Sequence, residues 1–178
     1  MKVDRGIWGT LEQAPAQAGA VEAAGYDALI AAEVKNDPFL QLTLAAEHTR
    51  GLELMTSIAV AFSRSPMTLA QTAHDLNEYA KGRLILGVGS QIRAHITRRF
   101  SMPWSKPAAR MREFVQAMRA IWACWNEGEA LDFRGEFYQH TLMTPNFHPF
   151  TARYGAPRVF LAAVGPRMTE VAGRWPTA

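Results

Sequence analysis

The sequence alternates short, nearly continuous apolar runs with longer segments of helical periodicity, and this alternation constrains the fold more than any other feature. Nearly continuous apolar runs are typical of parallel strands, because such strands are usually covered on both faces. Strand, helix, strand order with short connections predicts a parallel sheet with right-handed crossovers. The five expected strands cover Val3–Trp8, Tyr26–Ala32, Leu52–Val60, Arg83–Val88 and Val159–Val164.

Helix boundaries are marked by capping residues, prolines and glycines. Thr10 and Gln13 form a capping-box pattern, and Asp37-Pro38 and Ser65-Pro66 each place a cap directly before a proline. Glycines that can end the three helices follow at Gly25, Gly51 and Gly82. The pattern therefore predicts helices that begin near Leu11, Pro38 and Pro66.

The most regular helical pattern follows an irregular stretch over Gly89–Lys106. Its apolar face consists of Met111, Phe114, Val115, Met118, Ile121, Trp122 and Trp125, which recur at helical spacing. Beyond it, Phe133–His140 is expected to form a small hairpin or extended excursion, and Gly165-Pro166 is expected to open a last helix. A doubly wound sheet and a barrel both satisfy the whole pattern. Without a repeat or linker, the chain is interpreted as a single α/β domain over residues 1–178.

Composition places the chain among soluble globular proteins. Hydrophobic residues make up 48% and charged residues 20% of it, and no window approaches the roughly 18–20 apolar residues of a membrane span. The N-terminus has no apolar core like that of a signal peptide. The single cysteine, Cys124, allows no internal disulfide. The expected location is therefore the cytoplasm, with no membrane partner.

The net charge of +3 is mild, but basic residues concentrate between Val88 and Asn126. Arg93, Arg98, Arg99, Lys106, Arg110, Arg112 and Arg119 lie there against one acid, Glu113. Such a patch attracts phosphate, carboxylate tails or nucleic acid, and it also fits a solvated helix face. Phe100 and Trp104 are candidate stacking residues for nucleic acid. No recognition motif accompanies the charge, so a nucleic-acid partner is not expected.

Common catalytic and metal motifs are missing from the sequence. No two histidines stand at i, i+4 and none is near Cys124, so no metal site is expected. Gly87-Val88-Gly89-Ser90 lacks the later glycine of a dinucleotide fingerprint and the Lys-Ser/Thr ending of a phosphate loop. By itself it indicates only a sharply turning strand end. Gly165-Pro166-Arg167 combines a helix N-terminus with an arginine, a combination that suits an anion.

Several stretches together resemble the luciferase-like monooxygenase superfamily, and within it the oxidoreductases that use the deazaflavin coenzyme F420. They are Gly25-Tyr26-Asp27, Asp37-Pro38-Phe39, Thr56–Pro66, Gly82–Ser90 and Ala162–Pro166, in family order and spacing. The match extends from Met1 to about Gly173. The ordered set is specific, although no single piece is.

The resemblance implies a (β/α)8 barrel with the cofactor at the carboxyl ends of the strands. A non-proline cis peptide in a bulge of the third strand would fall at Ser57–Ile58 and back the tricyclic ring. Gly87, Gly89 and Ser90 would line the end of the fourth strand near the ring. The phosphate side of the cofactor tail would be held by Ala163, Val164, Gly165, Pro166 and Arg167. The basic stretch from Arg93 to Arg110 would attract an oligoglutamate tail.

The implied chemistry is hydride transfer to or from a small-molecule substrate, with the protein orienting the cofactor and excluding water. Related sugar-phosphate dehydrogenases carry a histidine after the second strand, where this chain has Glu33-Val34-Lys35, and a glutamate where Gln91 stands. A proton relay built on those two groups is therefore not expected. Glu33, Gln91 and His95 are left as candidate polar or catalytic contacts. An FMN-dependent monooxygenase of the same fold is the nearest alternative.

A complete barrel needs about 250 residues, and this chain has room for about five β/α units. The expectation is therefore a partial barrel: a truncated product, an excerpt of a longer protein, or a partial barrel completed by association. An open arc exposes strand edges, so self-association or a homodimer is expected. A degenerate, non-catalytic interaction protein is the alternative from a different functional class.

Overall fold

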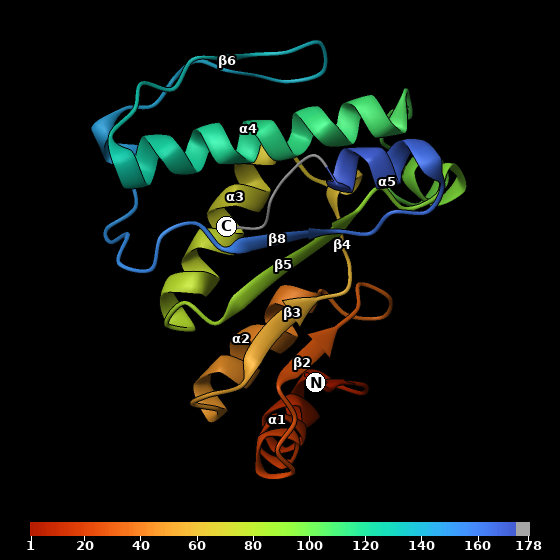
Figure 1. Cartoon of the computed structure of the whole chain (residues 1–178), viewed down its shortest axis with the longest axis vertical. Helices are drawn as coiled ribbons and strands as arrows, with labels where there is room; N and C mark the ends of the chain where they lie inside the picture. Colours follow the sequence, from red (N-terminus) through yellow and green to blue (C-terminus); the bar gives the residue numbers. More distant parts are fainter. Residues whose placement is uncertain (174–178) are drawn as a thin grey trace.

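The computed structural model describes residues 1–173 and consists of one parallel sheet with helices packed on it (Figure 1). Residues 174–178, the end of the predicted 1–178 domain, lie outside the described residues. The sheet strands are β1 (Asp4–Gly6), β2 (Ala28–Ala31), β3 (Glu53–Thr56), β4 (Ala59–Val60), β5 (Leu84–Gly89) and β8 (Arg158–Leu161). Their order is β1-β2-β3-β5-β4, with β8 on β5, and every pairing is parallel. The parallel α/β prediction is confirmed.

The expected strand over Leu52–Val60 is not continuous. It is divided into β3 and β4, which pair with the beginning and the end of β5 respectively. Between them lies a bulge with a cis peptide bond at Ser57–Ile58, the position that the family resemblance predicted. The prediction of one strand was wrong because Ser57 and Ile58 leave the strand path, and apolar composition does not reveal such a bulge.

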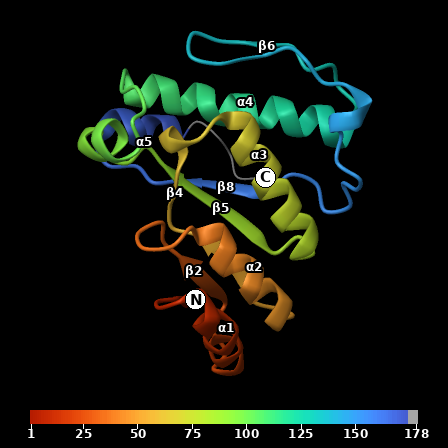
Figure 2. The same ribbon diagram turned by 180° about the vertical axis from the view of Figure 1, so that it is seen from behind.

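Within residues 1–173, five α-helices connect or follow the strands: α1 (Ala14–Ala23), α2 (Pro38–His48), α3 (Pro66–Tyr79), α4 (Pro107–Glu127) and α5 (Pro166–Gly173). A short 3-10 turn, Leu11–Gln13, precedes α1. The predicted caps are present, since Asp37 accepts a hydrogen bond from the Phe39 amide (2.9 Å) and Ser65 accepts one from Thr68 (3.1 Å). Figure 2 shows α2 and α3 in front of the sheet, and α4 packs against α3.

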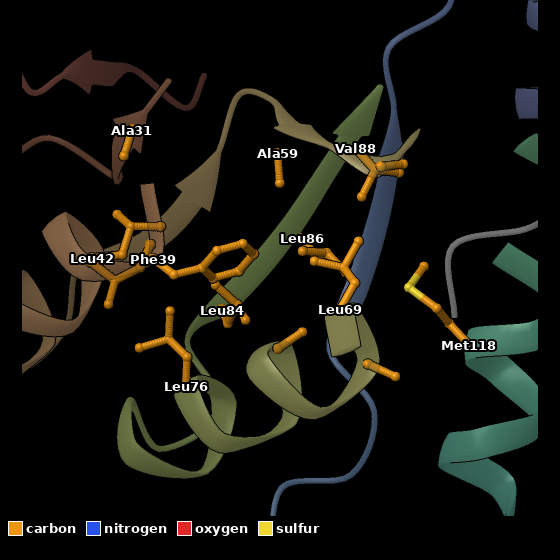
Figure 3. Packing of buried hydrophobic residues seen from close by; sticks show 14 of the residues in the cluster. Ala31, Phe39, Leu42, Ala59, Leu69, Leu76, Leu84, Leu86, Val88 and Met118 are labelled. Carbon is orange, nitrogen blue, oxygen red and sulfur yellow. The ribbon is translucent and has the colours of Figure 1, made fainter. Parts of the chain in front are cut away.

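The hydrophobic core lies between the sheet and these helices. Figure 3 shows Leu84 and Leu86 of β5 beside Phe39 of α2 and Leu69 and Leu76 of α3. The predicted apolar face of α4 is buried from Met111 to Trp122, and the Trp122 indole donates a hydrogen bond to Ala70 O (3.1 Å). Because successive strand residues point to opposite faces of the sheet, the other half of the strand side chains point away from these helices.

An excursion over residues 128–157 separates α4 from β8 and contains the predicted hairpin, β6 (Phe133–Arg134) and β7 (Gln139–His140), with a 3-10 turn at Pro145–Phe147. It extends over α4 in Figure 1. Two carboxylates hold it: Glu113 accepts backbone hydrogen bonds from residues 136–138, and Glu78 accepts one from the Tyr154 amide (2.8 Å). Within residues 1–173, no helix combines the length and apolarity that a bilayer crossing requires.

Glu53 joins two distant parts of the chain at the amino end of the sheet. Its carboxylate accepts hydrogen bonds from Lys2 (2.8 Å) and from Arg158 (2.6 Å), which lies across β5 in β8. The Lys2 ammonium, opposed by partial burial and assisted by the Arg158 guanidinium, holds the pKa of the Glu53 carboxyl below its ordinary value. The folded state therefore favours the charged carboxylate.

The stabilisation from Glu53 is expected to depend on pH. A lowered pKa means that the folded protein binds fewer protons, so the contribution is complete above the ordinary carboxyl pKa of about 4.3 and is lost as pH falls through the folded value. Urea unfolding of the wild type and Glu53→Gln measures it. The wild type should be more stable than the variant at pH 7 by a margin that shrinks at pH 3. A margin independent of pH would contradict this assignment.

Candidate functional site

A pocket of about 1180 Å³ lies where the bulge between β3 and β4 meets the carboxyl ends of β5 and β8. Its walls come from three parts of the chain that are distant in sequence. They comprise Ile58, Gly89–Arg93, Trp104, Lys106–Ala109, Ala162 and Val164–Met168. The bulge after β3 and the turns after β5 and β8 are therefore on the same side of the molecule, as the barrel prediction requires.

The bulge and the end of β5 form one apolar wall. Gly89 has no side chain, and a Cβ added there would lie 3.0 Å from Ile58 Cδ1 and 3.5 Å from Ala162 Cβ. Ile58 therefore occupies space that a side chain at position 89 would need. After β5, Gln91 has a positive φ of 60°, and its side-chain oxygen accepts a hydrogen bond from the Ile92 amide (3.0 Å). The Gln91 amide group is thus turned back onto its own loop.

The opposite wall comes from the segment before α4. Trp104 is half-buried and contacts the ring of Phe62 edge to face, with 5.8 Å between ring centroids. Arg110 fixes this segment by donating to Pro103 O (2.6 Å) and Tyr138 Oη (2.7 Å). Burial raises the pKa of Tyr138 above its ordinary value, against the effect of the Arg110 guanidinium. The phenol is therefore neutral at physiological pH and can accept this hydrogen bond.

The charged residues that line the pocket are all basic: Arg93, Lys106 and Arg167. Lys106 is paired with Glu136 at 2.6 Å, whereas no acidic partner is found for Arg93 or Arg167 within residues 1–173. Arg167 lies in the first turn of α5. In this turn the amides of Met168 (3.2 Å) and Thr169 (3.1 Å) donate hydrogen bonds to Gly165 O. Positive charge at an apolar pocket favours a ligand with a flat apolar body and an anionic end.

Most of the predicted cofactor residues line this pocket. They are Ile58, Gly89, Ser90, Val164, Gly165, Pro166 and Arg167. The other three lie beside it. Ser57 is exposed next to Ile58, and Gly87 is buried against Thr56, two residues before Gly89 in β5. Ala163 packs on the hydrophobic core.

The three candidate polar residues are not brought together. Gln91 lines the pocket, whereas His95 is exposed at the start of a π-helical turn, His95–Arg99. Glu33 lies behind the bulge, with its carboxylate paired to Arg64 at 2.6 Å. Among the described residues, no group of three His, Cys, Asp or Glu is placed to hold a metal ion.

Sequence reasoning missed several lining residues, namely Ile92, Pro107, Ala108, Ala109, Ala162 and Met168. Trp104 was considered only as a stacking residue for nucleic acid. The N-terminal turn of α4 contributes to the pocket although 17 residues separate it from the end of β5. The proline at its first position marks a helix start, but nothing local indicates which site that start will face.

Comparisons with known proteins agree with this arrangement. The profile of the luciferase-like monooxygenase family matches residues 3–175. An uncharacterized protein of Mycobacterium tuberculosis is 57% identical over 173 residues, which cover 97% of this chain and 51% of that protein. An F420-dependent glucose-6-phosphate dehydrogenase of Rhodococcus hoagii is 33% identical over 138 residues, covering 75% of this chain and 39% of that enzyme.

Solved structures share the fold. Riboflavin lyase, solved with modified FMN and riboflavin, superposes with a TM-score of 0.79 at 17% identity, covering 92% of this chain and 45% of that chain. The chain thus spans about half the length of the Mycobacterium tuberculosis protein and of riboflavin lyase. Its parallel strands, bulge and single-sided pocket correspond to a partial (β/α)8 barrel. This chain belongs to the luciferase-like monooxygenase family.

Proposed function

We propose that the pocket holds coenzyme F420 and that the protein is an oxidoreductase transferring a hydride between this cofactor and a small-molecule substrate. The observation that carries the proposal is the pocket itself, an apolar cavity between Ile58 and Trp104 with Arg93 and Arg167 lining it. A flat ring fits between the apolar walls, and a phosphate or carboxylate tail fits the arginines. The relative of Rhodococcus hoagii, named as F420-dependent, supports the same choice.

Each part of the pocket has a distinct role in this proposal. Ile58 and Gly89 would back the ring, with Ile58 occupying the space that a side chain at position 89 would need. Arg167 and the first turn of α5 would hold the phosphate. When bound, the deazaflavin would supply a two-electron centre that accepts or donates a hydride. The protein residues would orient the ring and exclude water from one of its faces.

FMN is the second candidate cofactor, because a ring of the same shape with a phosphate tail suits the same walls and the same arginine. Riboflavin lyase, which shares the fold, was solved with modified FMN. The alternatives of a non-catalytic interaction protein and of self-association are supported by the two sheet edges, β1 and β8, which have no further strand beside them among the described residues.

Titration with F420 and with FMN, followed by absorbance and fluorescence, tests the proposal. We expect F420 to bind more tightly than FMN. Arg167→Ala should weaken binding roughly tenfold because it removes a charge-assisted hydrogen bond to the tail. Arg112→Ala is the matched control: this exposed arginine on α4 does not line the pocket, so its loss should change the Kd less than about twofold.

Each other outcome of the titration is informative. Tighter binding of FMN would replace F420 by the flavin alternative. Failure of both cofactors to bind would overturn the proposed function and favour the interaction protein.

A further inference from the structure

We propose that Glu33 is a positioning residue that, together with Arg64, fixes the bulge between β3 and β4 and so places Ile58 as a wall of the pocket. The inference rests on the proposed function where it concerns a bound cofactor ring. It differs from the direct polar contact that the sequence suggested for Glu33, because it assigns the carboxylate to the protein's own backbone.

The contacts of Glu33 all lead to the bulge. Its Oε2 accepts hydrogen bonds from the Val60 amide (2.8 Å) and from Arg64 Nη1 (2.6 Å). Its own amide donates to Ile58 O (3.3 Å). The side chain is 9% exposed and does not line the pocket. One residue at the end of β2 therefore holds the bulge through both its main chain and its side chain.

Arg64 holds the same bulge from the side of β4. Glu33 and Arg64 together are called the clamp below. Its guanidinium donates to Val60 O (3.2 Å) and Ser63 Oγ (3.2 Å), and its second Nη donates to Asp37 Oδ2 (2.8 Å). It also lies over the Phe39 ring, 5.6 Å from the centroid. With so many donors engaged, the arginine has one geometry, and a partly buried ion pair of fixed geometry resists displacement of either partner.

Ile58 lies between the clamped points. The Ser57 amide before it donates to Ala31 O (2.8 Å), and the Val60 amide after it is held by Glu33. Its side chain contacts the bare backbone of Gly89, where even a methyl group would come within 3.0 Å of Cδ1. Because isoleucine is stiff at χ1, the backbone path largely determines where this side chain meets the pocket. A shift of the bulge therefore becomes a shift of the wall.

Glu22 offers a matched control at the opposite end of β3. Its carboxylate accepts backbone hydrogen bonds from Arg50 (2.9 Å), Gly51 (2.7 Å) and Leu52 (3.0 Å). It thus holds a loop through a carboxylate, as Glu33 does, but the loop is remote from the pocket-lining residues. Loss of Glu22 should cost stability without moving Ile58.

The test compares Glu33→Ala with Glu22→Ala in the whole chain, first without cofactor. In Glu33→Ala, the NMR signal of the Ile58 δ1 methyl should shift and the Val60 amide should exchange with solvent more than tenfold faster. In Glu22→Ala, both signals should stay as in the wild type. If Glu33→Ala does not fold, Glu33→Gln keeps the size of the side chain while removing the charge that holds Arg64. An unmoved Ile58 methyl in the folded Glu33 variant would overturn the clamp.

The second arm measures the bound ring. With F420 or FMN, whichever binds the wild type, the Glu33 variant should raise the Kd about tenfold and alter the visible spectrum of the ring, whereas Glu22→Ala should change neither. Wild-type affinity and spectrum retained by the Glu33 variant would overturn the role assigned to Glu33. Binding of neither cofactor by the wild type would instead refute the proposed function. The Ile58 methyl and Val60 amide signals would then show whether Glu33 holds the bulge.

Discussion

Gly87→Ala is expected to lower the free energy of unfolding by about 3 kcal/mol. Gly87 is buried in the central strand β5, where β3 approaches so closely that a Cβ would overlap the carbonyl oxygen of Thr56. The Thr56 hydroxyl also donates to Gly87 O (2.7 Å), which ties the two strands together at this point. The obstacle is backbone on both sides, so no rotamer change relieves it.

Urea unfolding of Gly87→Ala against the wild type measures this effect. Gly19→Ala is the control, because Gly19 lies in α1 with no atom within 4 Å of the added methyl group. That substitution should stabilise the protein slightly, by roughly 0.5–1 kcal/mol, since alanine loses less backbone entropy in a helix. Equal unfolding free energies for the two variants would contradict the close approach of β5 and β3.

Glu113→Ala is expected to lower the free energy of unfolding by roughly 3 kcal/mol and to release the excursion over residues 128–157. The Glu113 carboxylate is buried and accepts hydrogen bonds from the amides of Glu136 (2.9 Å), Phe137 (2.6 Å) and Tyr138 (2.6 Å). Alanine would leave three donors without their acceptor. Since Tyr138 also bonds Arg110 beside the pocket, the hairpin and the Trp104 wall should loosen together.

Chemical unfolding and amide exchange at residues 136–138 measure the loss. Glu136→Ala is the control on the same hairpin, where the carboxylate is exposed and pairs with the exposed Lys106. A surface pair of this kind contributes less than about 1 kcal/mol. If Glu136→Ala were as damaging as Glu113→Ala, the anchoring role of Glu113 would be wrong.

Part of the candidate site could be predicted because the strand and helix ends that form it are marked by glycine and proline in the sequence. Gly89-Ser90 follows an apolar strand, and Gly165-Pro166 opens a helix, so both could be placed at strand ends from the sequence. The bulge at Ser57–Ile58 came only from the family resemblance. The wall around Trp104 could not be placed, because its position depends on Arg110 reaching Pro103 and Tyr138, and Tyr138 lies 28 residues further along the chain.

Carboxylates were the least predictable group. Glu33, Glu53 and Glu113 look alike in the sequence, yet one is paired with Arg64, one bridges Lys2 and Arg158, and one caps a hairpin turn. Each role depends on partners that are 23 to 105 residues away. A carboxylate without a regular pattern around it carries no local signal of its partner.

By itself, the sequence determined the parallel α/β architecture, the helix starts at Asp37 and Ser65, and the apolar face of α4. These features depend on periodicity and capping, which act over a few residues and are therefore visible in the chain. Only the tertiary structure decided that Glu33 faces Arg64 and that the start of α4 completes the pocket. Those outcomes depend on contacts between distant segments, whose energies arise only when the sheet brings the segments together.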